Sequence, residues 1–267
     1  MSDGRWAVLL GRQELMRDPR VTQTLATRLK LPFADAARRV TIGWGIIGER
    51  LEEGAALELG EALKAAGVET RVVPEGELPV LPEAQPVAAA GFGPSSVKLF
   101  AKEDPLGEEQ SFGDILVVAA AAWQKETMRT VKVKEGPTPG QKMATWGLRL
   151  ATGLPLRIGP KEKEVEKVEK SKDLVFRIQL LTRQKTAHFL FQIDAEDFNY
   201  ACLGPKMEYG TYGNFRSLLA AFRERAPQAA LNRGASVLLA SQPVGTMGYD
   251  GPRDLERELR WLRAILR

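Results

Sequence analysis

Hydrophobic and polar residues alternate along two neighbouring stretches in the second half of the chain, residues 174–181 and 187–193. Alternation with a period of two is typical of β-strands that bury one face. The residues between the two stretches would form the turn of a hairpin, and a shorter apolar run over residues 198–203 predicts a further strand. The side chains expected on the buried face are Leu174, Phe176, Ile178, Leu180, Ala187, Phe189, Phe191 and Ile193.

An amphipathic helix is predicted after these strands, over residues 213–226. Its apolar residues recur at i, i+3, i+4 and i+7, the spacing that places side chains on one face of a helix. Pro227 would end this helix, because proline has no N–H to continue the hydrogen-bond ladder. A similar stripe predicts a terminal helix over residues 252–267, and a last apolar run over residues 236–240 precedes it.

The first eighty residues have a different pattern, in which short apolar runs alternate with helical stripes. Asp18 and Pro19 mark a helix start, with Asp as the N-cap and Pro in the first turn, where its missing N–H is not needed. The predicted order is strand, helix, helix, strand, helix, strand. The strands are expected at residues 6–10, 44–48 and 68–73, and the later helices at residues 35–40 and 52–66, the last one capped by Gly67.

Two sequence phrases accompany this order: Lys30-Leu-Pro-Phe-Ala-Asp-Ala-Ala-Arg-Arg-Val40 and Glu58-Leu-Gly-Glu-Ala-Leu-Lys-Ala-Ala-Gly-Val-Glu-Thr-Arg-Val-Val73. With them, residues 5–75 resemble the C-terminal domain of the bacterial ribosomal stalk protein and the related adaptor that feeds substrates to Clp proteases. The resemblance implies a small βααβαβ module over residues 1–78 that docks onto other proteins. The stalk family carries more lysines around the first phrase, so ribosomal factor recruitment is not carried over. The residues that would form the docking surface here are Lys30, Phe33, Arg38 and Arg39.

Residues 79–94 have the composition of a linker, because they are rich in Pro, Ala and Gly and lack periodicity. We place a domain boundary there. Further strands are predicted at residues 96–102, 112–123 and 127–134, before the hairpin strands. Several meandering strands followed by a closing helix resemble, in element order, a bacterial pleckstrin-homology-like domain over residues 95–267. The expected fold class is therefore α+β, with a β-rich, barrel-like second domain.

The basic residues are unevenly distributed. The formal net charge is +4, and residues 123–172 alone hold 12 Lys or Arg against 6 Asp or Glu. An excess of this kind attracts anionic partners such as lipid headgroups or nucleic acid. The residues that would carry such anion binding are Arg129, Lys132, Lys134, Lys142 and Arg149.

The sequence offers few residues for catalysis or metal binding. It has one histidine, His188, and one cysteine, Cys202. A structural zinc site needs four N or S ligands, so we expect neither a metal nor a cofactor. By strand parity, His188 lies on the more polar side of its strand, and Cys202 points inward as a small hydrophobic side chain. No catalytic residue is assigned, because no orienting partner for a base or nucleophile can be identified.

Two glycine-rich stretches do not qualify as nucleotide-binding loops. Residues 91–96 lack the third glycine of a dinucleotide fingerprint, and Pro94 removes an amide that would point at a phosphate. Residues 136–142 resemble a phosphate loop, but Gln141 separates the glycine from the lysine. We therefore expect binding to other proteins rather than binding of a nucleotide.

We expect a two-domain cytoplasmic adaptor that binds other proteins through its N-terminal module and its β-rich domain, and that is not an enzyme. A lone cysteine suits a reducing compartment, and no apolar run reaches the roughly 20 residues that cross a bilayer. Two alternatives stay open. One is a peripheral binder of anionic lipid or nucleic acid through residues 123–172. The other is a carboxylate-dependent hydrolase, because a site built from carboxylates alone stays open; Asp194, Glu196 and Asp197 lie close in sequence, although a turn between strands commonly contains acidic residues.

Overall fold

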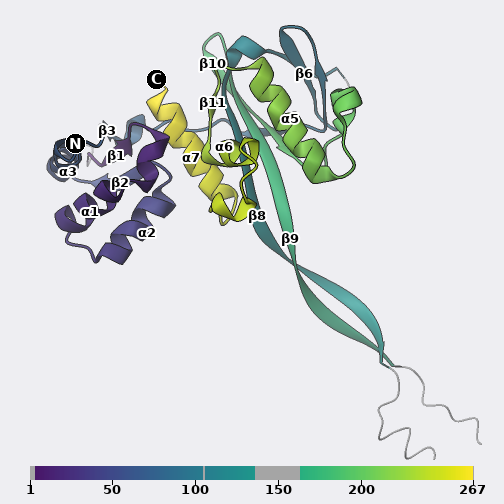
Figure 1. Cartoon of the computed structure of the whole chain (residues 1–267), viewed down its shortest axis with the longest axis horizontal. Helices are drawn as coiled ribbons and strands as arrows, with labels where there is room; N and C mark the ends of the chain where they lie inside the picture. Colours follow the sequence, from purple (N-terminus) through teal and green to yellow (C-terminus); the bar gives the residue numbers. More distant parts are fainter. Residues whose placement is uncertain (1–3, 105, 136–162, 267) are drawn as a thin grey trace, which may run out of the picture. The chain divides into compact units, whose positions relative to one another are not determined.

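A computed structural model describes the backbone of residues 4–104, 106–135 and 163–266, and the side chains of residues 4–104, 106–126 and 172–266 (Figure 1). Two compact units are present. The first contains residues 1–123 together with residues 174–267, and the second contains residues 124–173. No helix within the described ranges is long and apolar enough to cross a membrane. The mixed composition of helices and sheets confirms the α+β class.

The N-terminal residues form a three-stranded antiparallel sheet with the strand order β2-β1-β3, packed against three helices. The predicted order of strands and helices is confirmed. Asp18 caps α1 by accepting a hydrogen bond from the N–H of Arg20 at 2.9 Å. The elements are β1 (Trp6–Leu10), η1 (Gln13–Arg17), α1 (Pro19–Arg28), α2 (Phe33–Gly43), β2 (Ile46–Leu51), α3 (Glu53–Ala65), β3 (Thr70–Pro74) and η2 (Glu75–Glu77).

A five-stranded sheet with the order β11-β8-β9-β10-β4 forms the centre of the rest of the first unit. A second sheet has the order β5-β6-β7. Both sheets are open at their edges, so the barrel-like closure expected from the sequence is not found in the described residues. The strands are β4 (Ala84–Pro86), β5 (Ala89–Phe92), β6 (Ser96–Phe100), β7 (Glu108–Ser111), β8 (Ile115–Glu135), β9 (Lys163–Gln184), β10 (Ala187–Asp194) and β11 (Ala230–Leu231).

The stretch expected to be a linker contains two of these strands. β4 pairs with β10 in parallel, and β5 pairs with β6 in antiparallel orientation. The proline in β4 is compatible with this pairing. Because β4 is an edge strand, Pro86, which has no N–H, interrupts no hydrogen bonds in the interior of the sheet. Residues 84–86 and 89–92 of this stretch are thus part of the sheets.

The hairpin of β9 and β10 confirms the central strand prediction, with Leu180 opposite Phe191 and Ile178 opposite Ile193. The predicted one-sided burial was wrong in part. Leu174 is 43% exposed, whereas Gln179 and Leu181 are buried on the other face. Both faces are covered in this region, because α5 packs on one face and α7 lies beside the other (Figure 1).

The remaining helices include one confirmed prediction and two corrections. Helix α5 (Thr211–Arg225) matches the helix predicted from the amphipathic stripe. Its Phe215 packs against Phe176 of β9, with 5.5 Å between the centres of the two rings. The strand predicted at residues 198–203 is instead the 3-10 helix η4 (Tyr200–Lys206), which Asn199 caps. The apolar run at residues 236–240 belongs to a helix. The other elements are η3 (Phe112–Asp114), α6 (Arg233–Leu239), η5 (Val244–Thr246) and α7 (Pro252–Ile265).

Helix α7 is joined to the N-terminal sheet. The indole Nε1 of Trp261 donates to Leu10 O at 2.7 Å, and the Arg257 guanidinium bonds to Gly43 O and to Glu49. Trp261 is fully buried. Residues on both sides of the domain boundary expected near residue 78 are therefore in contact with each other. That residues 1–78 form a domain of their own stays a prediction.

A buried polar cluster holds α6 and α7 against β8. Asn232, the N-cap of α6, accepts from Ala120 N at 2.8 Å and donates to Ala120 O at 2.9 Å. The same amide donates to Glu258 Oε2 at 3.0 Å, and Tyr249 Oη also donates to that oxygen. Burial raises the pKa of Glu258, and the hydrogen bonds from Tyr249, from the N–H of Arg233 and from Asn232 oppose part of that rise.

Candidate functional site

Strand β4 forms an edge of the five-stranded sheet, because β10 is its one neighbour there. The N–H of Val87 donates to Gln192 O at 2.8 Å. Backbone groups alternate in direction along a strand, so Gln85 faces β10 like Val87, while Ala84 and Pro86 face away from the sheet. The exposed edge of β4 therefore offers the N–H and C=O of Ala84 and the C=O of Pro86.

A cavity lies on each face of this edge strand. The register pairs Ala84 with Leu190 and Gln85 with Phe191, so these two pairs point to opposite faces. The first cavity, here called the α7-side pocket, measures about 420 Å³ and contains Ala84 and Leu190 in its wall. The second, the β6-side pocket, measures about 430 Å³ and contains Gln85 and Phe191. Together with the edge of β4 they form the edge site.

Gln179, which lines the α7-side pocket, has a buried acceptor without a partner. Gln179 is 3% exposed, and its Oε1 has no hydrogen-bond partner among the described residues. Glu83 and Glu256 also line this pocket, together with Arg260. The Nε of Arg260 is directed at Pro79 O, 3.4 Å away. A buried unpaired acceptor is costly, so this wall is suited to a ligand that donates a hydrogen bond.

A chain of hydrogen bonds across β9 and β10 fixes the orientation of the Gln179 amide. Arg177 forms a bidentate ion pair with Asp194, at 2.6 and 3.1 Å. Gln192 Nε2 donates to Asp194 Oδ2 at 2.9 Å, and Gln179 Nε2 donates to Gln192 Oε1 at 3.2 Å. At the start of the chain, the Arg177 guanidinium lies 5.2 Å from the centre of the Trp123 ring. Because Nε2 of Gln179 donates to Gln192, the Oε1 of Gln179 is the amide atom that has no hydrogen-bond partner among the described residues.

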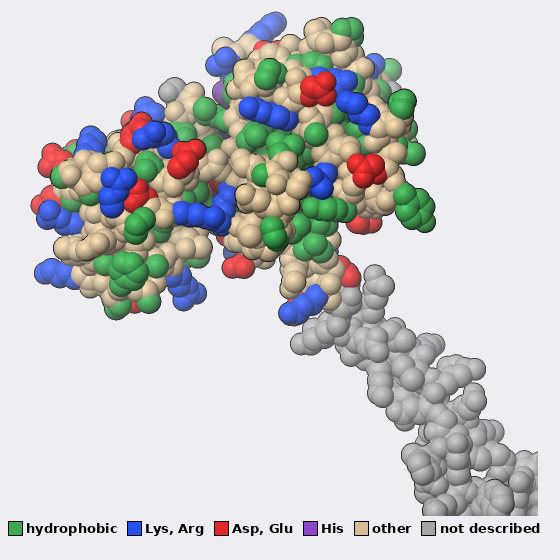
Figure 2. All heavy atoms as spheres, viewed as in Figure 1, with side chains coloured by type: hydrophobic (Ala, Val, Ile, Leu, Met, Phe, Trp, Pro, Cys, Tyr) green, Lys and Arg blue, Asp and Glu red, His purple; other side chains and the backbone are tan. Residues whose placement is uncertain are grey.

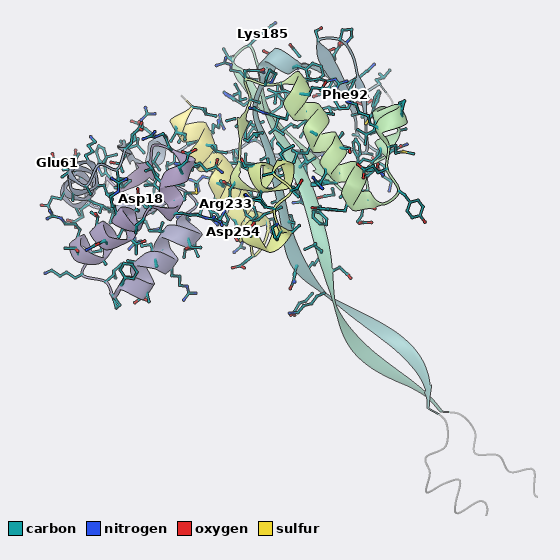
Figure 3. The ribbon with its side chains drawn as sticks, in the orientation of Figure 1. Asp18, Glu61, Phe92, Lys185, Arg233 and Asp254 are labelled. Carbon is teal, nitrogen blue, oxygen red and sulfur yellow. The ribbon has the colours of Figure 1, made fainter. Side chains whose placement is uncertain are left out.

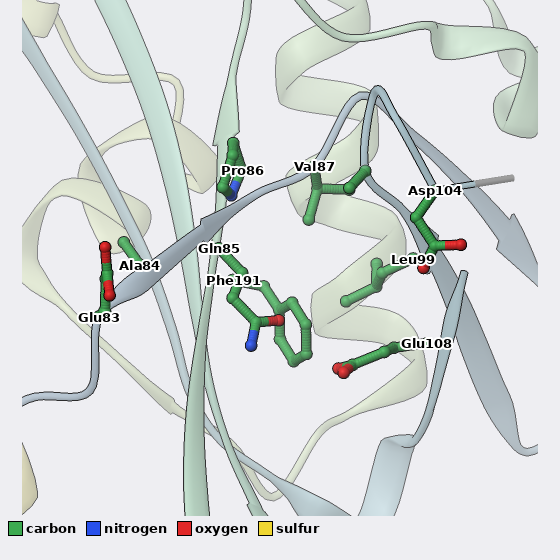
Figure 4. A pocket seen from close by; sticks show the side chains of 10 residues that line it. Glu83, Ala84, Gln85, Pro86, Val87, Leu99, Asp104, Glu108 and Phe191 are labelled. Atoms are coloured by element: carbon green, nitrogen blue, oxygen red, sulfur yellow. The ribbon is translucent and has the colours of Figure 1, made fainter. Parts of the chain in front are cut away.

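The β6-side pocket is apolar at its base and acidic at its rim. Figure 4 shows Gln85 and Phe191 on one wall and Leu99, Asp104 and Glu108 on the other. Glu83 lines both pockets. No Lys or Arg lines this second pocket, so its charged groups are all carboxylates.

The edge site as a whole is negative. Its carboxylates are Glu83, Asp104, Glu108 and Glu256, against the single cation Arg260. On the face drawn in Figure 2, by contrast, acidic and basic side chains are interspersed. This arrangement can bind a positively charged group that carries several hydrogen-bond donors. Among the described residues, neither the edge site nor any other place has a group of three His, Cys, Asp or Glu side chains that could hold a metal ion.

The predicted anion-binding residues fall outside the described side chains. Arg129, Lys132 and Lys134 lie on the backbone of β8, and Lys142 and Arg149 lie outside the described residues altogether. Anion binding by this segment stays a prediction.

The predicted docking residues lie close together in sequence around the start of α2. Phe33 is the first residue of that helix and is 61% exposed. Lys30 and Arg38 are also exposed, and Arg39 is half-buried. Docking through this surface also stays a prediction, although the exposure of Phe33 is compatible with it.

The residues considered for catalysis lie among contacts that do not form a catalytic group. His188 is half-buried and lies opposite Arg183 in the β9–β10 hairpin. Cys202 is half-buried in η4, and burial raises the pKa of its thiol, which makes the reactive thiolate less accessible. Asp194 is engaged by Arg177. Nothing in these contacts assembles a nucleophile with a base.

The edge site was missed because its signal is weak in the sequence. Residues 83–87 look like part of a proline-rich linker, and the other carboxylates of the site come from two distant segments, residues 104–108 and residue 256. An edge strand is recognised from its pairing, which no local pattern reports. In comparisons with protein-family models, with curated proteins and with solved structures, nothing matches this chain.

Proposed function

We propose that this protein is an adaptor that binds an extended, basic segment of a partner protein, by adding that segment as a new strand beside β4. Strand addition gives affinity through main-chain hydrogen bonds and specificity through pockets for alternate side chains. The observation that carries the proposal is the placement of one cavity on each face of the edge strand.

The geometry of an added strand matches this placement. Successive side chains of a strand point to opposite faces, so a segment paired with Ala84 would direct neighbouring residues into the α7-side pocket and the β6-side pocket. Its backbone would meet the free N–H and C=O of Ala84. Pro86 cannot donate, which limits the pairing to a short segment.

The chemistry of the pockets favours lysine or arginine in that segment. In the α7-side pocket a cationic side chain could donate to Gln179 Oε1 while it neutralises Glu83 or Glu256. In the β6-side pocket the aliphatic stem of a long basic side chain would pack on Phe191 and Leu99, and its charge would reach Asp104 or Glu108. Both contacts use atoms that are unpaired or solvent-facing in the free protein.

The docking surface of Lys30, Phe33, Arg38 and Arg39 would act as a second contact in the same adaptor role. Phe33 supplies an exposed aromatic ring, the kind of residue that is enriched in protein interfaces. Two separate contacts on one chain would allow it to bring two proteins together.

Fluorescence polarisation with a labelled peptide tests the proposal. The probe is a fluorescein-labelled Val-Lys-Arg-Val-Lys-Arg peptide, and the matched acidic probe replaces each Lys and Arg by Glu. We expect saturable binding of the basic probe alone, weakened by salt because the contacts are charged. The substitutions Glu83→Gln and Glu256→Gln, made together, should weaken binding at least tenfold.

Two variants distinguish strand addition from simple charge attraction. Ala84→Pro removes the outward N–H and leaves the bonds to β10 in place, so it should abolish binding, whereas Ala84→Ser keeps the N–H and should bind normally. Glu61→Gln, an exposed carboxylate on α3, is the control for charge. Equal binding of both probes, or full binding by a folded Ala84→Pro variant, would disprove the proposal.

A further inference from the structure

Two arginine side chains, neither of which lines the edge site, converge on the backbone carbonyl of Thr246. Arg17 Nη2 donates to Thr246 O at 3.2 Å, and Arg233 Nη2 donates to the same oxygen at 2.7 Å. Arg17 is the last residue of η1. Arg233, which is labelled in Figure 3, is the first residue of α6. Both guanidinium groups are permanently charged, so two positive charges meet here.

No carboxylate in the described part of the chain forms an ion pair with either guanidinium, whereas Arg12, Arg20, Arg177 and Arg257 each have one. Glu258 lies near Arg233, but its oxygens accept from the backbone N–H of Arg233, from Tyr249 and from Asn232. Neither guanidinium thus has a carboxylate in direct contact, and the nearby Glu258 offsets part of the charge of Arg233 from a distance.

Arg233 is held in this position by its surroundings. Its guanidinium lies 5.7 Å from the centre of the Trp44 ring, and its Nε has no hydrogen-bond partner among the described residues. Burial, and then the charge of Arg17, lower the pKa of Arg233. Charged groups in half-buried positions normally have a partner, which suggests that the partner here is a ligand.

A cavity of about 350 Å³ opens beside the two arginines. Met16 and Val237 supply apolar wall, and Gln13, Ser236 and Gln242 supply polar groups. Glu14 also lines the cavity, without an ion pair to either arginine. The volume falls at the lower end of the range for small-molecule sites, roughly 300–1,000 Å³.

We propose that this cavity binds a small organic oxyanion, a carboxylate or a phosphate monoester, between Arg17 and Arg233, with its short apolar group against Met16 and Val237. Guanidinium groups recognise both head groups with paired, charge-assisted hydrogen bonds. Because η1 and α6 supply one arginine each, the ligand would join two segments that are far apart in the sequence. This proposal does not depend on the edge site.

Isothermal titration calorimetry on the full chain tests it with three probes: hexyl phosphate, hexanoate and inorganic phosphate, with hexanol as the uncharged control. We expect hexyl phosphate or hexanoate to bind saturably and hexanol not to bind. The stronger of the two identifies the head group, and weaker binding of inorganic phosphate shows the contribution of the apolar wall. The melting temperature should rise by roughly 3–5 °C at ligand concentrations ten times Kd.

Variants locate the binding. Arg17→Gln should weaken binding at least tenfold while the ligand-free melting temperature stays nearly unchanged, since Arg17 is exposed and its removal relieves a like-charge contact. Glu14→Gln should strengthen binding two- to threefold, because it removes a negative charge from the wall. Arg38→Gln on α2 is the matched control and should bind like the wild type. Absence of saturable binding by all three anions, or unchanged binding in Arg17→Gln, would overturn the proposal.

Discussion

The indole ring of Trp261 occupies the space that a side chain at Gly45 would need. A Cβ built on Gly45 lies 2.2 Å from the ring, and Gly45 has a φ of +90°, which favours glycine. The same indole donates its N–H to Leu10 O. One contact thus depends on glycine in the turn before β2 and on tryptophan in the last helix, more than 200 residues later.

Gly45→Ala should therefore destabilise the protein by about 3–4 kcal/mol, because it combines a disfavoured backbone conformation with an overlap against a buried ring. Urea unfolding monitored by circular dichroism measures the change. Gly43→Ala is the control, since a Cβ at Gly43 has no neighbour within 4 Å. A loss below about 1 kcal/mol for Gly45→Ala would show that the ring can move aside.

Residues 1–78 alone should not unfold cooperatively. Without α7, the fragment exposes the surface that Trp261 covers and leaves Leu10 O without its buried donor. A fusion of residues 1–78 to residues 250–267 through a Gly/Ser linker should restore a cooperative transition in thermal circular dichroism. A sharp transition in the short fragment would instead support the independent module predicted from the sequence.

Gly234→Ala should destabilise the protein by about 3–5 kcal/mol, because a Cβ at this position lies 1.9 Å from Ala120 O, a backbone atom that cannot rotate away. Relief of the overlap requires α6 to shift, which breaks the paired hydrogen bonds between Asn232 and Ala120. Gly245→Ala, where a Cβ meets nothing within 4 Å, should change the free energy of unfolding by less than about 0.5 kcal/mol. Equal effects of the two substitutions would contradict this account.

The buried carboxyl of Glu258 makes stability depend on pH. Its folded-state pKa lies above the ordinary value of 4.5, so the folded state holds its proton more tightly than the unfolded state. This contribution is fully present below about pH 4.5 and is lost as the pH rises through the raised pKa. We therefore expect Glu258→Gln to lose less stability than the wild type between pH 5 and pH 8.

Urea unfolding at four pH values in that interval, for both proteins, checks the difference in slope. Glu258→Gln should also be less stable at pH 5, by roughly 1–3 kcal/mol, because one end of its amide would place a donor against an existing donor. Parallel pH profiles would mean that Glu258 does not titrate in this range.

The sequence supports the local elements better than their assembly. Helix α1 was predictable because Asp18 and Pro19 are strong local signals, and the β9–β10 hairpin was predictable because its strands alternate. Helix α6 was not predictable from the sequence, because its short apolar run has no helical period. The start of this helix also depends on Asn232, which bonds to a strand more than 100 residues earlier.

The candidate sites show the same limit. Phe33 could be singled out by its place in a sequence phrase, whereas the edge site requires the pairing of β4 with β10. Arg17 and Arg233 come together through Thr246 O, a backbone atom whose position depends on the tertiary fold. In each case the missing information is a long-range contact.

The amide of Asn232 acts as one extra residue of a strand. β11 pairs with Val117 and Val118, and the Asn232 side chain then takes both backbone groups of Ala120 as a peptide unit would. Along these rungs the outer side of β8 is closed to other chains, while β4 at the opposite end of the sheet is open. The proposed partner strand would therefore find these rungs of β8 already paired, whereas β4 at the opposite end of the sheet has β10 as its one neighbour.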